Sequence, residues 1–244
     1  MKRRYYLSAG TAALTVCVAG CTGADTSDPD NETSSEPDDG TTVSEEFPPY
    51  PDSESMSFSG DGETVTDGFE LTHDGPTILE VEHEGDEAFD VSITEADAST
   101  PVAAIPSVLG PYSGRSIHDL TKGDYTLDIG ASGAWNITVY DLPAYEGGTG
   151  LSVPLDRDGT FGSVVGPIDF PDGSVPFEIT FDSTESINRA LLVDREGQTA
   201  GALFDNQQME SDGDTDTTSQ TVDVSGVGYL AIESTTGWQL SIGE

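Results

Sequence analysis

The chain has 244 residues, of which 46 are Asp or Glu and 8 are Lys or Arg, giving a formal net charge of −38 at pH 7. This length accommodates one or two domains. The acid excess excludes nucleic acid as a natural partner, because a nucleic-acid-binding surface needs basic residues that neutralise phosphates. The acids are spread through the whole chain. This favours adaptation to multimolar salt, which screens the repulsion between carboxylates, over an acidic protein loaded with calcium.

The first 20 residues have the organisation of an export signal, with a basic start, an apolar stretch and small residues at the end. The apolar stretch Leu7–Ala19 has 13 residues, fewer than the roughly 20 that a membrane-spanning helix needs. Arg3 and Arg4 are typical of twin-arginine export signals. We therefore expect residues 1–20 to be a signal peptide.

Cys21 follows Val18, Ala19 and Gly20 in the pattern of a lipobox, whose Cys becomes the lipidated first residue of the mature protein. Cys17, the other Cys of the chain, lies inside the predicted signal peptide, so cleavage leaves no pair for a disulfide. These residues predict an extracellular protein anchored by lipid to the outer face of the cytoplasmic membrane. An uncleaved anchor, or an ordinary signal peptide with a chance Cys, is the alternative.

The segment 21–55 is dominated by Asp, Glu, Ser, Thr and Pro and has almost no apolar residues. Such a composition does not offset the entropy lost on folding, so we expect a disordered acidic linker after the lipidated Cys. Asn31 lies in a glycosylation sequon within this linker, and Asn136 lies in a second sequon within an expected strand.

Residues 56–244 contain two copies of one apolar pattern, which predicts two tandem domains over 56–143 and 148–244. At an offset of 103 residues, Leu127, Ile129, Trp135, Ile137 and Val139 are matched by Leu230, Ile232, Trp238, Leu240 and Ile242. At an offset of 98 residues, Leu79, Val81 and His83 are matched by Phe177, Ile179 and Phe181. The segment Asp205–Ser219, longer in the second copy, absorbs the difference.

Apolar and polar residues alternate within each copy, as is typical of strands with one buried face. The residues on either side of Gly130–Gly133 predict a hairpin. Because one apolar face per strand requires a second sheet to cover it, we expect an all-β chain of two tandem antiparallel β-sandwiches of jelly-roll type. Trp135 and Trp238 fall on the buried phase and are expected in the two cores.

The first copy carries a set of spaced motifs: Phe58-x-Gly60-x-Gly62, His83-x-Gly85, Phe89-x-Val91, and Gly123-x-Tyr125-x-Leu127-x-Ile129 leading to Trp135-x-Ile137. In these motifs it resembles a small β-sandwich module of prokaryotic extracellular and lipid-anchored proteins, distantly similar to the pre-peptidase C-terminal sandwiches. With its leader, the whole chain resembles a twin-arginine-exported lipoprotein of haloarchaeal type. The resemblance implies a fold and no activity, because such modules usually occur as appendages.

Side chains that carry catalysis are scarce in this sequence. It lacks an HExxH pair, a GxSxG elbow and a Gly-rich phosphate loop with Lys. Of the three His, His83 and His118 are expected as partly buried framework residues, and His73 as a solvated residue beside a turn. We therefore expect a protein that is not an enzyme and holds no cofactor.

One segment presents oxygen ligands that suit calcium. Asp212, Asp214 and Asp216 alternate along it, and together they form a candidate metal site. Thr217 stands where an EF-hand loop has Gly, and Asp223 stands where it has Glu. In a chain this acidic, a solvated loop is the alternative.

Together these features predict a lipid-anchored cell-surface protein that acts as a non-catalytic binding, interaction or structural module. Its partners would be the membrane, through the lipid, and an unidentified surface protein or glycan. An accessory ligand-binding subunit of a transporter or of a hydrolase system is the alternative. The stretch Pro143–Gly150 contains three Gly and allows a hinge, with a ligand cleft between the two copies.

Overall fold

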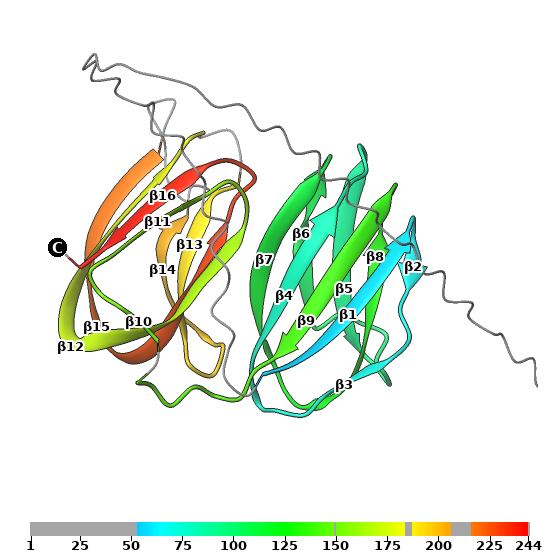
Figure 1. Ribbon diagram of the computed structural model, residues 1–244, viewed down its shortest axis with the longest axis horizontal. Helices are drawn as coiled ribbons and strands as arrows, with labels where there is room; N and C mark the ends of the chain where they lie inside the picture. Colours follow the sequence, from blue (N-terminus) through cyan, green and yellow to red (C-terminus); the bar gives the residue numbers. More distant parts are fainter. Residues whose placement is uncertain (1–52, 149, 184–186, 206–215, 244) are drawn as a thin grey trace, which may run out of the picture. The chain divides into compact units, whose positions relative to one another are not determined.

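The computed structural model describes residues 53–148, 150–183, 187–205 and 216–243. These residues form β-strands and no helix, which confirms the all-β fold (Figure 1). The predicted signal peptide, with Arg3, Arg4 and the lipobox, lies outside the described residues, as do Cys21 and Asn31. The strands are β1 (Glu54–Asp61), β2 (Thr64–Val65), β3 (Phe69–Leu71), β4 (Gly75–His83), β5 (Ala88–Glu95), β6 (Ala103–Leu109), β7 (Tyr112–Leu120), β8 (Gly123–Gly130), β9 (Ala134–Asp141), β10 (Leu151–Ser152), β11 (Leu155–Gly159), β12 (Ser163–Phe181), β13 (Arg189–Asp194), β14 (Thr199–Asp205), β15 (Asp216–Glu233) and β16 (Trp238–Ile242).

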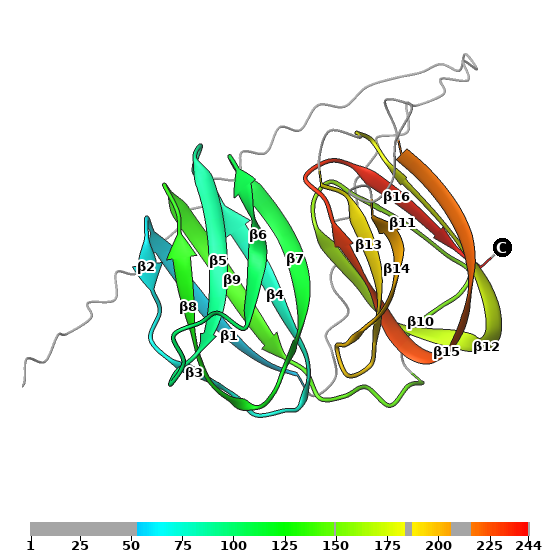
Figure 2. The same cartoon turned by 180° about the vertical axis from the view of Figure 1, so that it is seen from behind.

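Strands β1–β9 form two antiparallel sheets, called sandwich 1 below. One sheet has the order β1-β9-β4-β7, and the other has the order β2-β8-β5-β6 with β3 also paired to β8. Figure 2 shows the second sheet in front of the first. Residues of both sheets, among them Phe89, Leu127 and Trp135, meet in one buried cluster. With β2 and β3 counted as one strand, these eight strands in two sheets have the arrangement of a jelly roll.

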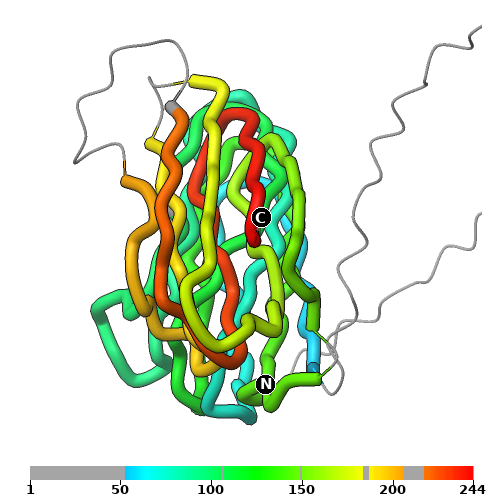
Figure 3. Tube along the Cα trace, turned by 90° about the vertical axis from the view of Figure 1, so that its left-hand side faces the viewer, coloured from blue at the N-terminus to red at the C-terminus, as the bar shows by residue number. Residues whose placement is uncertain are grey.

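Strands β10–β16 form one seven-stranded sheet, called sandwich 2, with the order β11-β16-β12-β15-β13-β14 and β10 beside β12. Two of its strands are very long, since β12 has 19 residues and β15 has 18. Their pairing changes register between Val165 and Ile168 and again between Phe170 and Gly173. Bulges of this kind bend a strand, and Figure 3 shows both strands running the length of sandwich 2. The bent sheet encloses a buried cluster of its own.

The pairing registers of the two sandwiches match the offsets found in the sequence. In sandwich 1, β4 pairs with β9 so that Leu79 faces Val139 and His83 faces Trp135. In sandwich 2, β12 pairs with β16 so that Phe177 faces Ile242 and Phe181 faces Trp238. The offsets of 98 and 103 residues therefore bring equivalent residues to equivalent places in the two ladders.

The predicted hairpin around Gly130–Gly133 is wrong. β8 and β9, on either side of this turn, belong to different sheets of sandwich 1 and do not pair. The turn carries the chain across the core from one sheet to the other. Alternation of apolar residues identified the buried face of each strand, but it holds no information about the neighbour with which the strand pairs.

Both Trp side chains are buried as predicted, and each packs on a Gly of the adjacent edge strand. A Cβ on Gly60 would lie 2.5 Å from Cζ2 of Trp135, and a Cβ on Gly159 would lie 2.5 Å from Cζ2 of Trp238. The indole N–H of Trp135 donates to the Gly62 carbonyl at 3.0 Å, and that of Trp238 donates to the Phe161 carbonyl at 2.8 Å. The repeat therefore extends to a pair of glycines that the sequence pattern had not matched.

A third buried cluster, called the joint cluster, packs sandwich 1 against sandwich 2 within one compact unit. Its buried members are Ile78 and Leu142 from the first half and Val164, Val193, Tyr229 and Ala231 from the second. Beside it, the Arg115 backbone N–H donates to the Gly162 carbonyl at 2.9 Å. The two copies thus share a hydrophobic contact, a point that the sequence left open.

Candidate functional site

The described part of the chain does not include the side chains of the candidate metal site. Asp212 and Asp214 lie outside it, and of Asp216 only the backbone, at the start of β15, is described. Within the described ranges, no group of three or more His, Cys, Asp or Glu is arranged to hold a metal ion. No helix there is long and apolar enough to span a membrane. Asn136 is exposed on β9, with its Nδ2 at 3.5 Å from Oε2 of Glu82.

His83 is a core residue, with 2% of its surface exposed. Its ring stacks on Phe89 with the centroids 4.5 Å apart. Because its Nδ1 lies 3.1 Å from the Gly110 carbonyl, which can only accept, Nδ1 carries the proton. Nε2 has no hydrogen-bond partner among the described residues. These contacts agree with the framework role expected for this residue.

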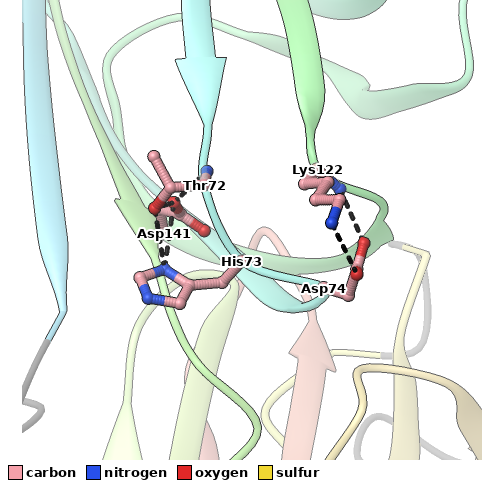
Figure 4. A network of polar contacts seen from close by, with 5 residues as sticks. All are labelled: Thr72, His73, Asp74, Lys122 and Asp141. Atoms are coloured by element: carbon pink, nitrogen blue, oxygen red, sulfur yellow. Dashed lines mark hydrogen bonds and ion pairs between the residues drawn. The ribbon is translucent and has the colours of Figure 1, made fainter.

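His73, expected to be solvated beside a turn, keeps 32% of its side chain exposed and also has a partner in the structure. Its Nδ1 lies 3.2 Å from Oδ2 of Asp141, a carboxylate that is 2% exposed. The same oxygen accepts the backbone N–H of Thr72 at 2.6 Å and its hydroxyl at 2.8 Å (Figure 4). Asp141 ends β9, so this cluster fastens the corner between β3 and β4 to the neighbouring strand.

Thr72, His73 and Asp141 contain the side-chain types of a hydrolytic triad, but their geometry differs from one. A triad needs the carboxylate on one ring nitrogen of the His and the nucleophile on the other. Here the Thr72 hydroxyl lies 3.1 Å from Nδ1, the same nitrogen that faces Asp141. The arrangement therefore holds a corner in place and does not activate the hydroxyl.

A cleft between the two sandwiches is the candidate binding site. It has a volume of about 490 Å³ and is lined by β6 and β7 of sandwich 1 and by residues 187–199 and 231–235 of sandwich 2. This volume falls in the range of sites that hold small organic ligands. Four large apolar side chains in the described chain are exposed, and two of them, Leu109 at 83% and Ile187 at 48%, line this cleft.

Formal charge is almost absent from the lining of the cleft. Among its described residues, Arg115 and Glu233 are the only Lys, Arg, Asp or Glu side chains. Arg115 Nη2 donates to Oε1 of Glu80 at 2.6 Å, and Glu233 Oε2 accepts from Nη1 of Arg189 at 3.0 Å. Both charges are therefore compensated by partners of opposite sign. A neutral concave surface is unexpected in a chain where almost one residue in five is acidic.

His118 belongs to this lining and is neutral at physiological pH. Burial lowers the pKa of His118 from 6.5 to about 4. Its Nε2 lies 2.9 Å from the hydroxyl oxygen of Ser116, which also lines the cleft. Besides the ion-paired Arg115 and Glu233, the polar side chains of the described lining are thus an uncharged imidazole and several hydroxyls. Burial, with a smaller contribution from the charge of Glu233, also raises the pKa of the lining residue Tyr112 to about 12, so its hydroxyl stays protonated.

The linker between the sandwiches is fastened rather than free to act as a hinge. The carboxylate of Asp169 on β12 accepts the backbone N–H of Gly148 at 3.1 Å and that of Gly150 at 3.2 Å. Gly147 and Gly148 have φ of 97° and 95°, a conformation that favours Gly. Gly147 and Gly148 therefore serve a defined turn, and the joint cluster holds the two walls of the cleft together.

The residues of the cleft could not be predicted as a set from the sequence, because they come from segments that lie far apart along the chain. The one usable signal in the sequence is β6, where the run from Ala103 to Leu109 contains no charged residue. A free edge strand is usually protected by charge or by Pro. In β6, which ends its sheet, only Pro106 has that character.

Comparisons with known proteins find little. No family model matches the chain, and no curated protein matches it either. Among solved structures, the crystal structure of the PBSX exported protein XepA is 10% identical, with 78% of this chain and 86% of that chain covered and a TM-score of 0.26. The atomic structure of Sulfolobus Turreted Icosahedral Virus is 13% identical, with coverages of 83% and 97% and a TM-score of 0.18. Similarity at this level carries no argument about function.

Proposed function

We propose that this protein is a lipid-anchored cell-surface protein that binds a ligand in the cleft between its two sandwiches and catalyses no reaction. The cleft is the observation that carries the proposal. It is concave, it exposes apolar side chains, and its described lining carries no net formal charge in an otherwise acidic chain. Exposed apolar surface costs free energy in water, so its concentration at one concave place favours a site that is covered in use.

The anchor and the binding site are supported by different observations. Anchoring rests on Arg3, Arg4 and the lipobox before Cys21. A Cys21→Ser variant, expressed in the native host, is expected in the medium instead of the membrane fraction, as measured by immunoblotting after membrane sedimentation. Retention of the variant in the membrane fraction would contradict lipid anchoring and favour an uncleaved anchor.

Binding in the cleft is tested with N-phenyl-1-naphthylamine, an uncharged dye whose fluorescence rises in apolar surroundings. The full-length Cys21→Ser protein in multimolar KCl is titrated with the dye, so that no attached lipid competes. A Leu109→Asp/Ile187→Asp double variant is expected to weaken dye binding at least about tenfold, because it places charge on the apolar lining. Val65→Asp, at a 61% exposed valine on β2 away from the cleft, is the matched control and should leave binding unchanged. Equal dye binding by all three proteins would overturn the cleft as the binding site.

A further inference from the structure

We infer that the cleft takes an uncharged aliphatic molecule rather than an ion, a peptide or a sugar. The inference rests on the proposed function, since it names the class of ligand for the same cleft. It draws on three features of the lining: compensated charges, aliphatic walls and hydroxyl-bearing polar groups.

The compensated charges of the described lining disfavour an ionic ligand. An ion moved from water into an apolar site loses several kcal/mol of hydration unless a group of opposite charge meets it. Arg115 already faces Glu80, with Nε at 3.0 Å and Nη2 at 2.6 Å from the same Oε1. Glu233 already faces Arg189. A carboxylate or ammonium ligand would therefore meet charged groups that already have a partner of opposite sign.

Aliphatic side chains make up the apolar part of the walls. Those from sandwich 1 are Ala104, Ile105, Val108, Leu109 and Ile117, and those from sandwich 2 are Ile187, Leu191, Val193, Ala231 and Ile232. Tyr112 is the one aromatic residue of the described lining, and it is 8% exposed with its ring edge-on to Phe161 at 5.4 Å. The described lining therefore presents no aromatic ring flat for a sugar to stack on, whereas branched aliphatic walls suit a hydrocarbon chain or ring.

Hydroxyls supply the polar contacts. Ser116 and Thr199 line opposite walls, and neutral His118 lies beside Ser116. Such groups donate to or accept from an alcohol or carbonyl without requiring a charge on the ligand. A strand added to the edge of β6 would be a peptide ligand, but β6 contains Pro106, which has no backbone N–H to donate. The geometry thus favours a small molecule with an apolar body and an uncharged polar end.

The test uses three competitors with one chain length and different head groups: 1-octanol, octanoate and octylammonium. Each is added to the complex of N-phenyl-1-naphthylamine with full-length Cys21→Ser protein in multimolar KCl, where distant carboxylates are screened and direct contacts decide. Octanol is expected to displace half the dye at a concentration at least about tenfold lower than either ion. Displacement by octanoate or octylammonium at the same concentration as octanol would overturn the inference. It would leave the proposed function intact, since the cleft would still bind.

A charge placed in the lining sharpens the test. Thr199→Lys puts an added ammonium at an exposed position of the cleft wall. It should raise the affinity for octanoate, relative to the affinity for octanol, about fivefold or more. Thr221→Lys adds the same charge at an exposed position of β15 outside the lining, and it should leave the ratio unchanged. An equal change in both variants would show that net charge, and not the lining, sets the preference. Loss of dye binding from the cleft would instead contradict the proposed function, and the Leu109→Asp/Ile187→Asp variant reports that separately.

Discussion

The two sandwiches share one strand order and one register, yet they turn their corners differently. In sandwich 1 the chain leaves regular pairing at Thr72–Asp74, between β3 and β4, and at Thr121–Lys122, between β7 and β8. In sandwich 2 the corresponding chain stays paired, because β12 and β15 continue through both corners, with Phe170 opposite Gly226 and Gly173 opposite Val224.

Side-chain hydrogen bonds close the corners of sandwich 1, whereas main-chain pairing closes the corners of sandwich 2. Asp141 holds Thr72 and His73, and Asp74 accepts the backbone N–H of Lys122 at 3.0 Å, which ties the two corners to each other. The comparison shows that the same alternation of apolar residues accompanies the same layers and pairing register in both sandwiches. The corners can be closed by side-chain or by main-chain hydrogen bonds.

The two Trp residues test the shared part of the fold and should give the largest effect. Trp135→Ala and Trp238→Ala each remove a side chain that is 3% exposed and leave a cavity beside a Gly, so each should lower the free energy of unfolding by about 3–5 kcal/mol. Urea unfolding in multimolar KCl, followed by circular dichroism, measures both. A loss in one variant alone would show that the two cores are not equivalent.

Asp141 tests the difference between the corners. Asp141→Ala should lower the free energy of unfolding by about 2–3 kcal/mol, because it leaves the Thr72 backbone N–H and hydroxyl without their acceptor. Asp172, the residue of sandwich 2 that corresponds to Asp74, is exposed in a corner closed by main-chain pairs, and Asp172→Ala should change stability by less than about 0.5 kcal/mol. Similar losses in the two variants, measured by urea unfolding, would remove the distinction drawn above.

His118 tests a smaller difference between the sandwiches, which is a titratable residue at one position of the shared pairing register. It faces Thr77 on β4, and Val222, which cannot titrate, takes its place opposite Val175 in sandwich 2. Burial lowers the folded-state pKa of His118 to about 4, so between pH 6.5 and about 4 the unfolded chain binds more protons. Stability is lost as the pH falls through this window.

The His118→Val variant should abolish that part of the pH dependence. Between pH 7 and about 5, the wild type should lose up to about 2 kcal/mol more than the variant. The difference between the two proteins is the quantity to measure, since carboxylates titrate in both. Parallel curves would show that His118 is solvated in the folded protein.

The layers of the fold were predictable because they depend on local alternation. Leu79, Val81 and His83, spaced two apart, pointed to a buried face, and the recurrence of that spacing at Phe177–Phe181 gave the equivalence that the ladders confirm. The match of Gly60 with Gly159 could not be recognised from the sequence. Within the motif Phe58-x-Gly60-x-Gly62, Gly60 alone has an identical counterpart in the second copy. Its role depends on the indole above it, which no local pattern reveals.

The cleft could not be predicted, for a different reason. Its walls require the sandwiches to pack through the joint cluster, and the members of that cluster, such as Ile78 and Tyr229, lie on strand faces that alternation would leave to solvent. The contact between His73 and Asp141 could not be predicted either, since Asp141 is 68 positions further along the chain. Contacts between distant segments decided both.

The fastened linker has a consequence for how the protein would take up its ligand. With Asp169 holding Gly148 and Gly150, and the joint cluster packed behind, the walls of the cleft are set before anything binds. Uptake into such a preformed site proceeds by simple diffusion, and the dissociation rate alone then sets the lifetime of the complex. Occupancy would follow the outside concentration passively. A partner protein could distinguish the ligand-bound form only by direct contact with the mouth of the cleft, because ligand binding would cause no domain movement.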